Sequence, residues 1–117
     1  MIDFKIGTPY NFREYNCWDY VANIRADNNI KTKLFKPTNI GNAFKLITAQ
    51  MQKLEHGLIL VTNKQDFDIV IVKKANVYHC GIIYGNEVMH CSRPLKQVVK
   101  ESFIEFIKPY ESYTLWR

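Results

Sequence analysis

Among the cysteines and histidines of this 117-residue chain, three have types and positions that would suit acyl-transfer chemistry: Cys17, His79 and His90. A cysteine nucleophile needs a base within hydrogen-bond reach, and that base needs a third group to orient it. Cys17 stands at the start of a run that we expect to be helical, where unpaired N–H groups and the helix dipole favour the thiolate. We therefore expect Cys17 to be the nucleophile, His79 the base and His90 the residue that orients the base.

The same three residues could instead hold a zinc ion, because zinc accepts mixed cysteine and histidine ligands. The chain has three cysteines, however, and no Cys-x-x-Cys pair of the kind that structural zinc sites use. An odd number of cysteines also does not suit a disulfide framework. We expect no metal and no other cofactor.

The two histidines lie on segments that predict a β-hairpin. Residues 77–84 and 88–91 are rich in β-branched and aromatic side chains, and the Gly-Asn pair at 85–86 is a strong signal for a two-residue loop. Because side chains alternate along a strand, a loop of this length places His79 and His90 on the same face, diagonally opposite each other. The hairpin thus predicts that the two imidazoles come within reach of each other.

The same register assigns different surroundings to the remaining cysteines. Cys80 would pair with Cys91, and both would lie on the opposite face as small core residues. Gly81 would face His90 and, lacking a side chain, would leave open space beside it. Cys17 is therefore the cysteine that we expect to have catalytic partners.

Other segments supply the elements that must position these side chains. Asn16 is a good N-cap, with Asp19 as its capping partner, for a helix that begins at the next residue and ends near 27–29. A second helix begins after 38–39, shows apolar side chains at helical spacing and ends at Gly57, which is a good C-terminal cap.

Beyond the helices the pattern changes to short strands rich in β-branched residues. The expected strands are 58–61, 67–72, 77–84, 88–91, 97–100 and 113–116. Helices first and strands second predict an α+β fold, in which N-terminal helices pack on a central antiparallel sheet of about five to six strands. With 117 residues and no linker, residues 1–117 are expected to form a single catalytic domain.

Composition and charge narrow the classes of partner. The formal net charge of +5 is weak support for an anionic partner, but the basic residues are scattered and carry no nucleic-acid-binding motif, so we expect no nucleic acid. No apolar run approaches the ~20 residues that a membrane span needs. The N-terminus lacks the order of a signal peptide, which predicts synthesis in the cytoplasm.

Four stretches of the chain resemble the NlpC/P60 family of compact, papain-like cysteine peptidases. G-T-P-Y at residues 7–10 resembles the family's segment ahead of the nucleophile, and N-C-W-D-Y-V at 16–21 resembles its D-C-S-G-[FL]-V helix start. F-D-I-V-I-V at 67–72 is similar to its G-D-L-V-F-F strand. Y-H-C-G-I-I-Y-G-N-E-V-M-H-C-S at 78–92 resembles its H-V-G-I-Y-[LI]-G-N-x-x-[FM]-[IV]-H-A-S hairpin and is the most specific match.

The resemblance implies a papain-like fold and the same three roles for Cys17, His79 and His90. It adds Tyr10, which matches a family tyrosine that lines the site and helps to hold the developing oxyanion, together with the backbone N–H of Cys17. The implied reaction is hydrolysis, through an acyl-enzyme on Cys17, of peptide stems of bacterial peptidoglycan. In this family the bond is typically the γ-D-glutamyl link to a diamino acid.

Two departures from the family pattern bear on the substrate. Trp18-Asp19 replaces the family's Ser-Gly, and the loop between Tyr10 and Cys17 is shorter. Trp18 would either cover the start of the helix or contribute to substrate binding. Asp19 reads as a capping partner rather than a catalytic acid.

The variant N-C-W-D start, with no targeting or wall-binding module, looks more like phage tail-associated members of the family. Such a protein would be made in the host cytoplasm, assemble with other phage tail proteins and reach the cell wall in the virion. Two alternatives use the same residues: a non-catalytic tail structural or assembly protein that keeps the fold, and a deamidase or transglutaminase-like toxin on the same fold.

Overall fold

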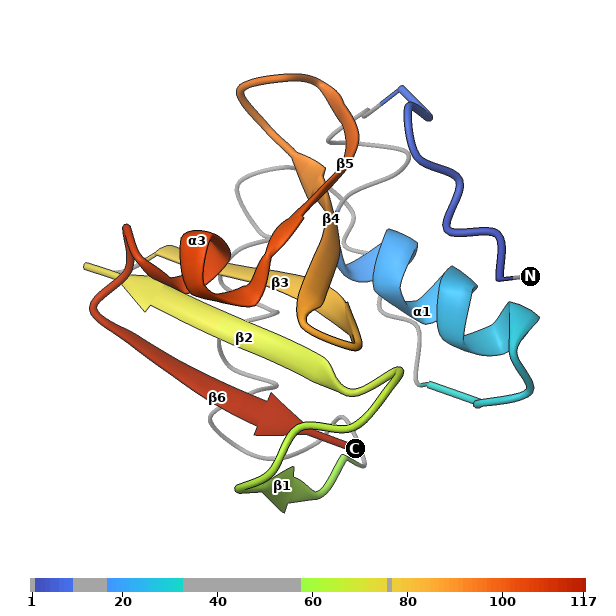
Figure 1. Cartoon of the computed structure of the whole chain (residues 1–117), viewed down its shortest axis with the longest axis horizontal. Helices are drawn as coiled ribbons and strands as arrows, with labels where there is room; N and C mark the ends of the chain where they lie inside the picture. The colour runs from blue at the N-terminus through green and yellow to red at the C-terminus, as the bar shows by residue number, and fades with distance from the viewer. Residues whose placement is uncertain (1, 10–16, 33–57, 76) are drawn as a thin grey trace, which may run out of the picture.

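The computed structural model describes residues 2–9, 17–32, 58–75 and 77–117. Within these ranges, six strands form one antiparallel sheet and two helices accompany it (Figure 1). The helices are α1 (Cys17–Asp27) and α3 (Phe103–Ile107). The strands, in their order across the sheet, are β1 (Leu60–Val61), β6 (Ser112–Trp116), β2 (Ile69–Lys74), β3 (Val77–Tyr84), β4 (Glu87–Ser92) and β5 (Gln97–Ser102). The predicted α+β class with five to six antiparallel strands is therefore confirmed.

Helix α1 begins at Cys17, as the sequence predicts, and ends at Asp27, within the expected range. Asp19 lies in its first turn and Arg25 in its last, so each charge opposes the nearer end of the helix dipole. The helix lies against β3 and β4. The expected cap Asn16 and the second helix predicted up to Gly57 lie outside the described residues.

The sheet is covered on both faces, which explains why β2 carries a continuous apolar run. Ile69 and Ile71 point into a core shared with α1, whereas Val70 and Val72 point into a second core shared with α3. All four are buried. A strand that is buried on both faces is expected to lose the alternation of apolar and polar residues.

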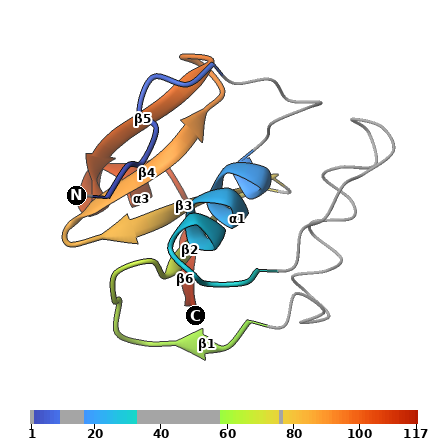
Figure 2. The same cartoon turned by 90° about the vertical axis from the view of Figure 1, so that its right-hand side faces the viewer.

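Residues 7–9 lie beside β5 at the outer edge of the sheet (Figure 2). The backbone N–H of Gly7 donates to the carbonyl of Val98 over 2.8 Å, and the N–H of Val98 donates to the carbonyl of Thr8 over 2.9 Å. The hydroxyl of Tyr20 donates to the carbonyl of Phe4 over 2.7 Å. These bonds tie the N-terminal segment to β5 and to α1.

The β3–β4 hairpin has the predicted two-residue loop. Tyr84 pairs with Glu87, and Ile82 pairs with Met89. Gly85 has a φ of +60°, a conformation that glycine adopts at little cost. This register places alternate residues of both strands on opposite faces of the sheet, as the sequence indicates.

The open space predicted beside His90 is not there. A Cβ added to Gly81 would collide with Cγ1 of Val88 and would come within 3.2 Å of Cβ of His90. The side chain of Val88 therefore fills the room that the glycine leaves. Gly81 permits close packing at this point of the hairpin rather than an opening.

Helix α3 was not predicted, because five residues are too few to show helical periodicity. Its start is nevertheless marked by Ser102, whose hydroxyl accepts a hydrogen bond from the backbone N–H of Glu105 over 3.2 Å. A serine followed three residues later by glutamate is the pattern of a capping box. Phe106 of this helix is buried in the second core.

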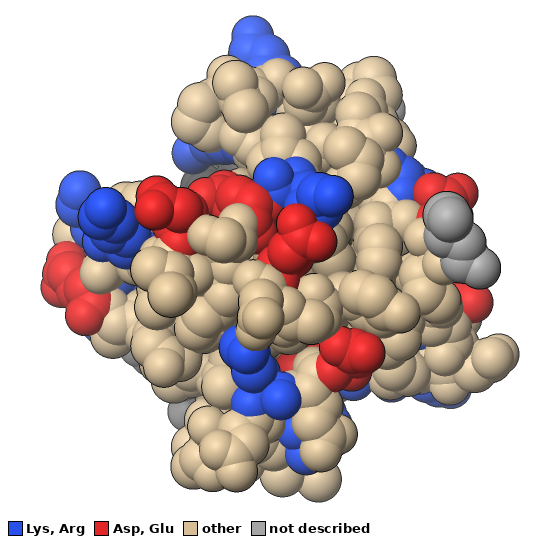
Figure 3. All heavy atoms as spheres, in the orientation of Figure 1, with Lys and Arg blue, Asp and Glu red and all other residues tan. Residues whose placement is uncertain are grey.

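Charges of both signs are interspersed on the face of the molecule that Figure 3 displays. On that face the excess of basic residues is thus not gathered into a single patch. Within the part of the chain that the structure describes, no helix is long and apolar enough to cross a membrane.

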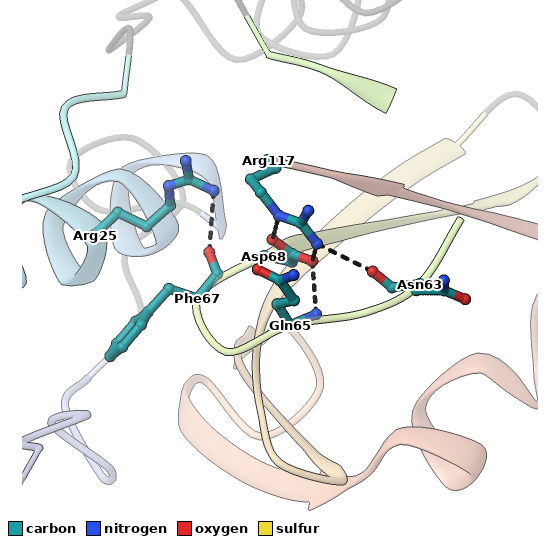
Figure 4. Close-up of polar contacts among 6 residues, drawn as sticks. All are labelled: Arg25, Asn63, Gln65, Phe67, Asp68 and Arg117. Atoms are coloured by element: carbon teal, nitrogen blue, oxygen red, sulfur yellow. Dashed lines mark hydrogen bonds and ion pairs between the residues drawn. The ribbon is translucent and has the colours of Figure 1, made fainter. Parts of the chain in front are cut away.

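A cluster of polar contacts fixes α1 and the end of β6 to the turn that precedes β2 (Figure 4). The guanidinium of Arg25 donates to the carbonyl of Phe67 over 3.0 Å. Arg117 donates to both carboxylate oxygens of Asp68 over 2.9 and 2.8 Å, and the N–H of Gln65 donates to the same carboxylate over 2.7 Å. Because Asp68 is buried, these bonds balance a charge that is removed from water.

Candidate active site

The structure brings Cys17, His79 and His90 together around one pocket. Cys17 is the first residue of α1, whereas His79 lies near the start of β3 and His90 in the middle of β4. The Nε2 atom of His79 lies 2.9 Å from Nδ1 of His90, a hydrogen-bond distance, and the two rings are nearly perpendicular. The predicted placement of both histidines on one face is confirmed by this contact.

The surroundings of Cys17 favour its ionised form. The pKa of this thiol lies well below its ordinary value. The largest cause is a hydrogen bond from the thiol of Cys80; a hydrogen bond with His79 and the positive charge of its ring act in the same direction. Burial opposes these effects, because it disfavours a charge. Cys17 therefore has the character of a nucleophilic thiolate.

The other two cysteines keep their protons. Hydrogen bonding to Cys17, followed by burial, raises the pKa of Cys80 well above its ordinary value. Burial is the main cause that raises the pKa of Cys91 to about 12. Both side chains belong to the core shared with α1, as predicted. The prediction missed, however, that Cys80 also interacts with Cys17.

A fourth functional group, Glu101 on β5, was not predicted. Its Oε2 atom lies 2.6 Å from Nε2 of His90. In the β4–β5 register Glu101 pairs with Val88, so it lies diagonally opposite His90 on the same face. The turn between these strands has no Gly-Asn loop that fixes the pairing from sequence, and no signal in the chain identifies Glu101.

His90 is held firmly between polar and apolar neighbours. Only 9% of its side chain is exposed. Its ring lies 4.7 Å from the ring of Phe106, which also packs at 5.8 Å from the ring of His79. Burial, and then the nearby charge of His79, lower the pKa of His90, while Glu101 acts in the opposite direction. His90 is thus suited to remain a neutral imidazole between two hydrogen-bond partners.

The pocket has a volume of about 280 Å³ and is open to solvent. Cys17, His79, His90 and Glu101 lie in its wall. The remaining lining residues are Val77, Tyr78, Ser92, Arg93, Pro94 and Tyr110. Tyr78, Arg93 and Tyr110 therefore lie around the same open pocket as the thiol and the two imidazoles.

Of the two residues assigned to substrate and oxyanion binding, the structure describes Trp18. Trp18 is 1% exposed and packs in the core with Tyr20 and Ile24. Trp18 is not among the described residues that line the pocket. The physical reason is that the first turn of α1 turns this side chain toward the sheet. Tyr10 lies outside the described residues.

Two further observations concern a possible metal centre and the likeness of the chain to known proteins. No group of three or more histidine, cysteine, aspartate or glutamate residues within the described ranges is arranged to hold a metal ion. A scan against models of known protein families and a search of curated proteins both find no match to the chain. A function for the site has to be inferred from its chemistry.

Proposed function

We propose that the protein is a cysteine hydrolase of the papain-like NlpC/P60 type, an endopeptidase or amidase acting on the peptide stems of bacterial peptidoglycan. One observation carries the proposal. A thiol of lowered pKa at the N-terminus of a helix meets a histidine whose far nitrogen is hydrogen-bonded to a second, buried histidine. This is the arrangement that an activated cysteine nucleophile requires.

In the proposed reaction, the sulfur of Cys17 attacks the carbonyl carbon of the scissile amide. The carbonyl oxygen becomes an oxyanion, for which the backbone N–H of Cys17 at the positive end of α1 is a suitable donor. His79, acting as an acid, gives its proton to the leaving amine, and a thioester remains on Cys17. His79 then takes a proton from water as the water attacks the thioester, which releases the acid and restores the thiolate.

The choice of substrate rests on the four stretches that resemble the family, above all on residues 78–92. Two of those stretches contribute to the wall of the pocket: Cys17 comes from the second, and Tyr78, His79, His90 and Ser92 come from the fourth. A net charge of +5 suits an anionic wall polymer. Placement in a phage tail, beside other tail proteins, is part of the same proposal.

The test compares wild type with Cys17→Ala on purified sacculi and on defined muropeptides, with the products identified by mass. Wild type should release cleaved stem peptides, and Cys17→Ala should release none. Cys91→Ala is the matched control, because it removes a buried thiol that stays protonated. Cleavage that persists in Cys17→Ala would refute the proposal. Deamidation or transfer on glutaminyl peptides by wild type, with stem peptides left intact, would point to the deamidase or transglutaminase alternative.

A further inference from the structure

Glu101 completes a chain of hydrogen-bonding groups that begins at Cys17. Nε2 of His90 lies 2.6 Å from the Glu101 carboxylate, and Nδ1 of His90 lies 2.9 Å from Nε2 of His79. Both ring nitrogens of His90 are therefore engaged, one on each side. The side chain of Glu101 is 36% exposed, so it lies at the pocket wall and not deep in the core.

The carboxylate of Glu101 determines which atom donates and which accepts in each of these hydrogen bonds. An ionised carboxylate can only accept hydrogen bonds, so Nε2 of His90 has to donate to Glu101. A neutral imidazole carries one N–H, which leaves Nδ1 of His90 as an acceptor. Nε2 of His79 then has to donate to it. The nitrogen of His79 that remains for Cys17 is Nδ1, and it is left free to accept the thiol proton.

We propose that Glu101 is a positioning residue that fixes the tautomers of both histidines and so directs the basic nitrogen of His79 at Cys17. The inference deepens the proposed hydrolase function and rests on it for its catalytic consequence, although the tautomers themselves do not depend on any substrate. Without Glu101, His90 could carry its proton on Nδ1. Nδ1 would then face Nε2 of His79 as a second donor, and the bond between the rings would be lost unless His79 also changed tautomer.

The packing around the two histidines indicates that Glu101 is needed to fix their tautomers rather than to hold their rings in place. Phe106 lies against both imidazoles, and Val88 fills the space beside Gly81. The contacts with Phe106 restrain the rings but cannot distinguish one ring nitrogen from the other. Among the described neighbours of His90 other than His79, Glu101 is the residue whose hydrogen bond selects the ring nitrogen that carries the proton.

The experiment reads the tautomers directly by ¹⁵N NMR of histidine-labelled protein across neutral pH. In wild type, His90 should be protonated at Nε2 and not at Nδ1. In Cys17→Ala, which removes the partner of Nδ1, the neutral ring of His79 should carry its proton at Nε2. In Glu101→Leu, His90 should show a mixture of tautomers. Glu87→Gln, which removes an exposed carboxylate on β4, is the matched control and should match wild type.

Turnover supplies the second readout. Glu101→Leu should lower kcat about tenfold or more, because part of the His79 population would have the wrong tautomer and general acid–base catalysis would contribute less to the rate. KM should change little. Glu101→Gln should lie between Glu101→Leu and wild type, since its amide oxygen can still accept from His90. It also serves as the reference should Glu101→Leu fail to fold.

The outcomes separate this inference from the proposed function. The role of Glu101 would be overturned if His90 of the wild type is protonated at Nδ1. It would also be overturned if Glu101→Leu keeps both the wild-type tautomer and the wild-type kcat. If the wild type shows the expected tautomers but cleaves no stem peptide, the positioning role of Glu101 is supported and the proposed peptidase function is refuted.

Discussion

Hydrogen bonding between the thiols of Cys80, on β3, and Cys17, at the start of α1, couples the ionisation of the two sulfurs. Two sulfurs that share one proton cannot both ionise easily, so their pKa values move apart. The pKa of Cys17 is lowered well below its ordinary value, and the pKa of Cys80 is raised well above it. The negative charge therefore resides on Cys17, which faces the pocket, and the proton on Cys80, which is buried.

The first prediction concerns this shared proton. Cys80→Ala should raise the pKa of Cys17, because it removes the largest of the effects that lower it. The measurement is the rate of alkylation by iodoacetamide as a function of pH, with the modified residue identified by mass. In wild type, Cys17 should react at pH values below the ~8.5 at which an ordinary thiol ionises.

Two variants make this test specific. Cys80→Ser retains a hydroxyl donor and should keep the pKa of Cys17 lower than Cys80→Ala does. Cys91→Ala removes a second buried thiol that does not contribute to the lowering and should titrate like wild type. If Cys80→Ala titrates like wild type, the hydrogen bond has no influence on the nucleophile.

The second prediction concerns stability in mild acid. Burial, and then the charge of His79, hold the pKa of His90 below its ordinary value of 6.5 in the folded protein. The unfolded chain therefore binds this proton more readily, so the free energy of unfolding should fall as pH drops from 6.5 toward the lower folded value. This contribution is fully present above pH 6.5, and its slope is at most about 1.4 kcal/mol per pH unit.

Urea unfolding between pH 5 and 8 measures this effect. His90→Asn retains a polar side chain between His79 and Glu101 but cannot titrate, so its stability should depend less on pH below 6.5 than that of wild type. Equal slopes for the two proteins below pH 6.5 would show that the folded protein accepts a proton on His90 as readily as the unfolded chain does.

Local signals were sufficient to predict three parts of the fold. The start of α1 at Cys17 follows from the N-cap expected at Asn16, and the Gly-Asn loop sets the pairing of Tyr84 with Glu87. Because side chains alternate along a strand, that pairing alone brings His79 and His90 onto one face. The candidate nucleophile and the two imidazoles beside it could therefore be predicted from local sequence signals.

The parts that were missed depend on contacts between distant segments. The register of β5 against β4 places Glu101 beside His90, and no turn residue specifies that register. The approach of α1 to β3 decides that Cys80 contacts Cys17 and that Trp18 faces the core. Such relations arise from packing across the sheet, which a pattern within one segment cannot report.

The third prediction concerns the close packing at Gly81. Gly81→Ala should destabilise the protein by about 1–3 kcal/mol, the usual cost of an extra group in a filled space, because its Cβ would collide with Val88. Val88→Ala in the same chain should recover part of that loss by vacating the space. Chemical unfolding of both single variants and the double variant measures this coupling, and strictly additive losses would contradict the contact.

The fourth prediction concerns the polar cluster that joins the end of β6 to the turn before β2. Asp68 is 1% exposed, and Arg117 supplies two of its hydrogen bonds. Arg117→Ala should lower the free energy of unfolding, because the buried carboxylate of Asp68 loses two of its hydrogen-bond donors.

The control for this variant is Lys5→Ala, which breaks the more exposed ion pair between Lys5 and Asp27. Exposed pairs of this kind contribute about 0–1 kcal/mol, so Lys5→Ala should unfold close to wild type. Asp68→Asn together with Arg117→Ala should recover part of the loss, since a neutral amide is cheaper to bury than an unpaired carboxylate. If Arg117→Ala unfolds at the same denaturant concentration as Lys5→Ala, water replaces Arg117 at the carboxylate, and the cluster does not hold β6 to this turn.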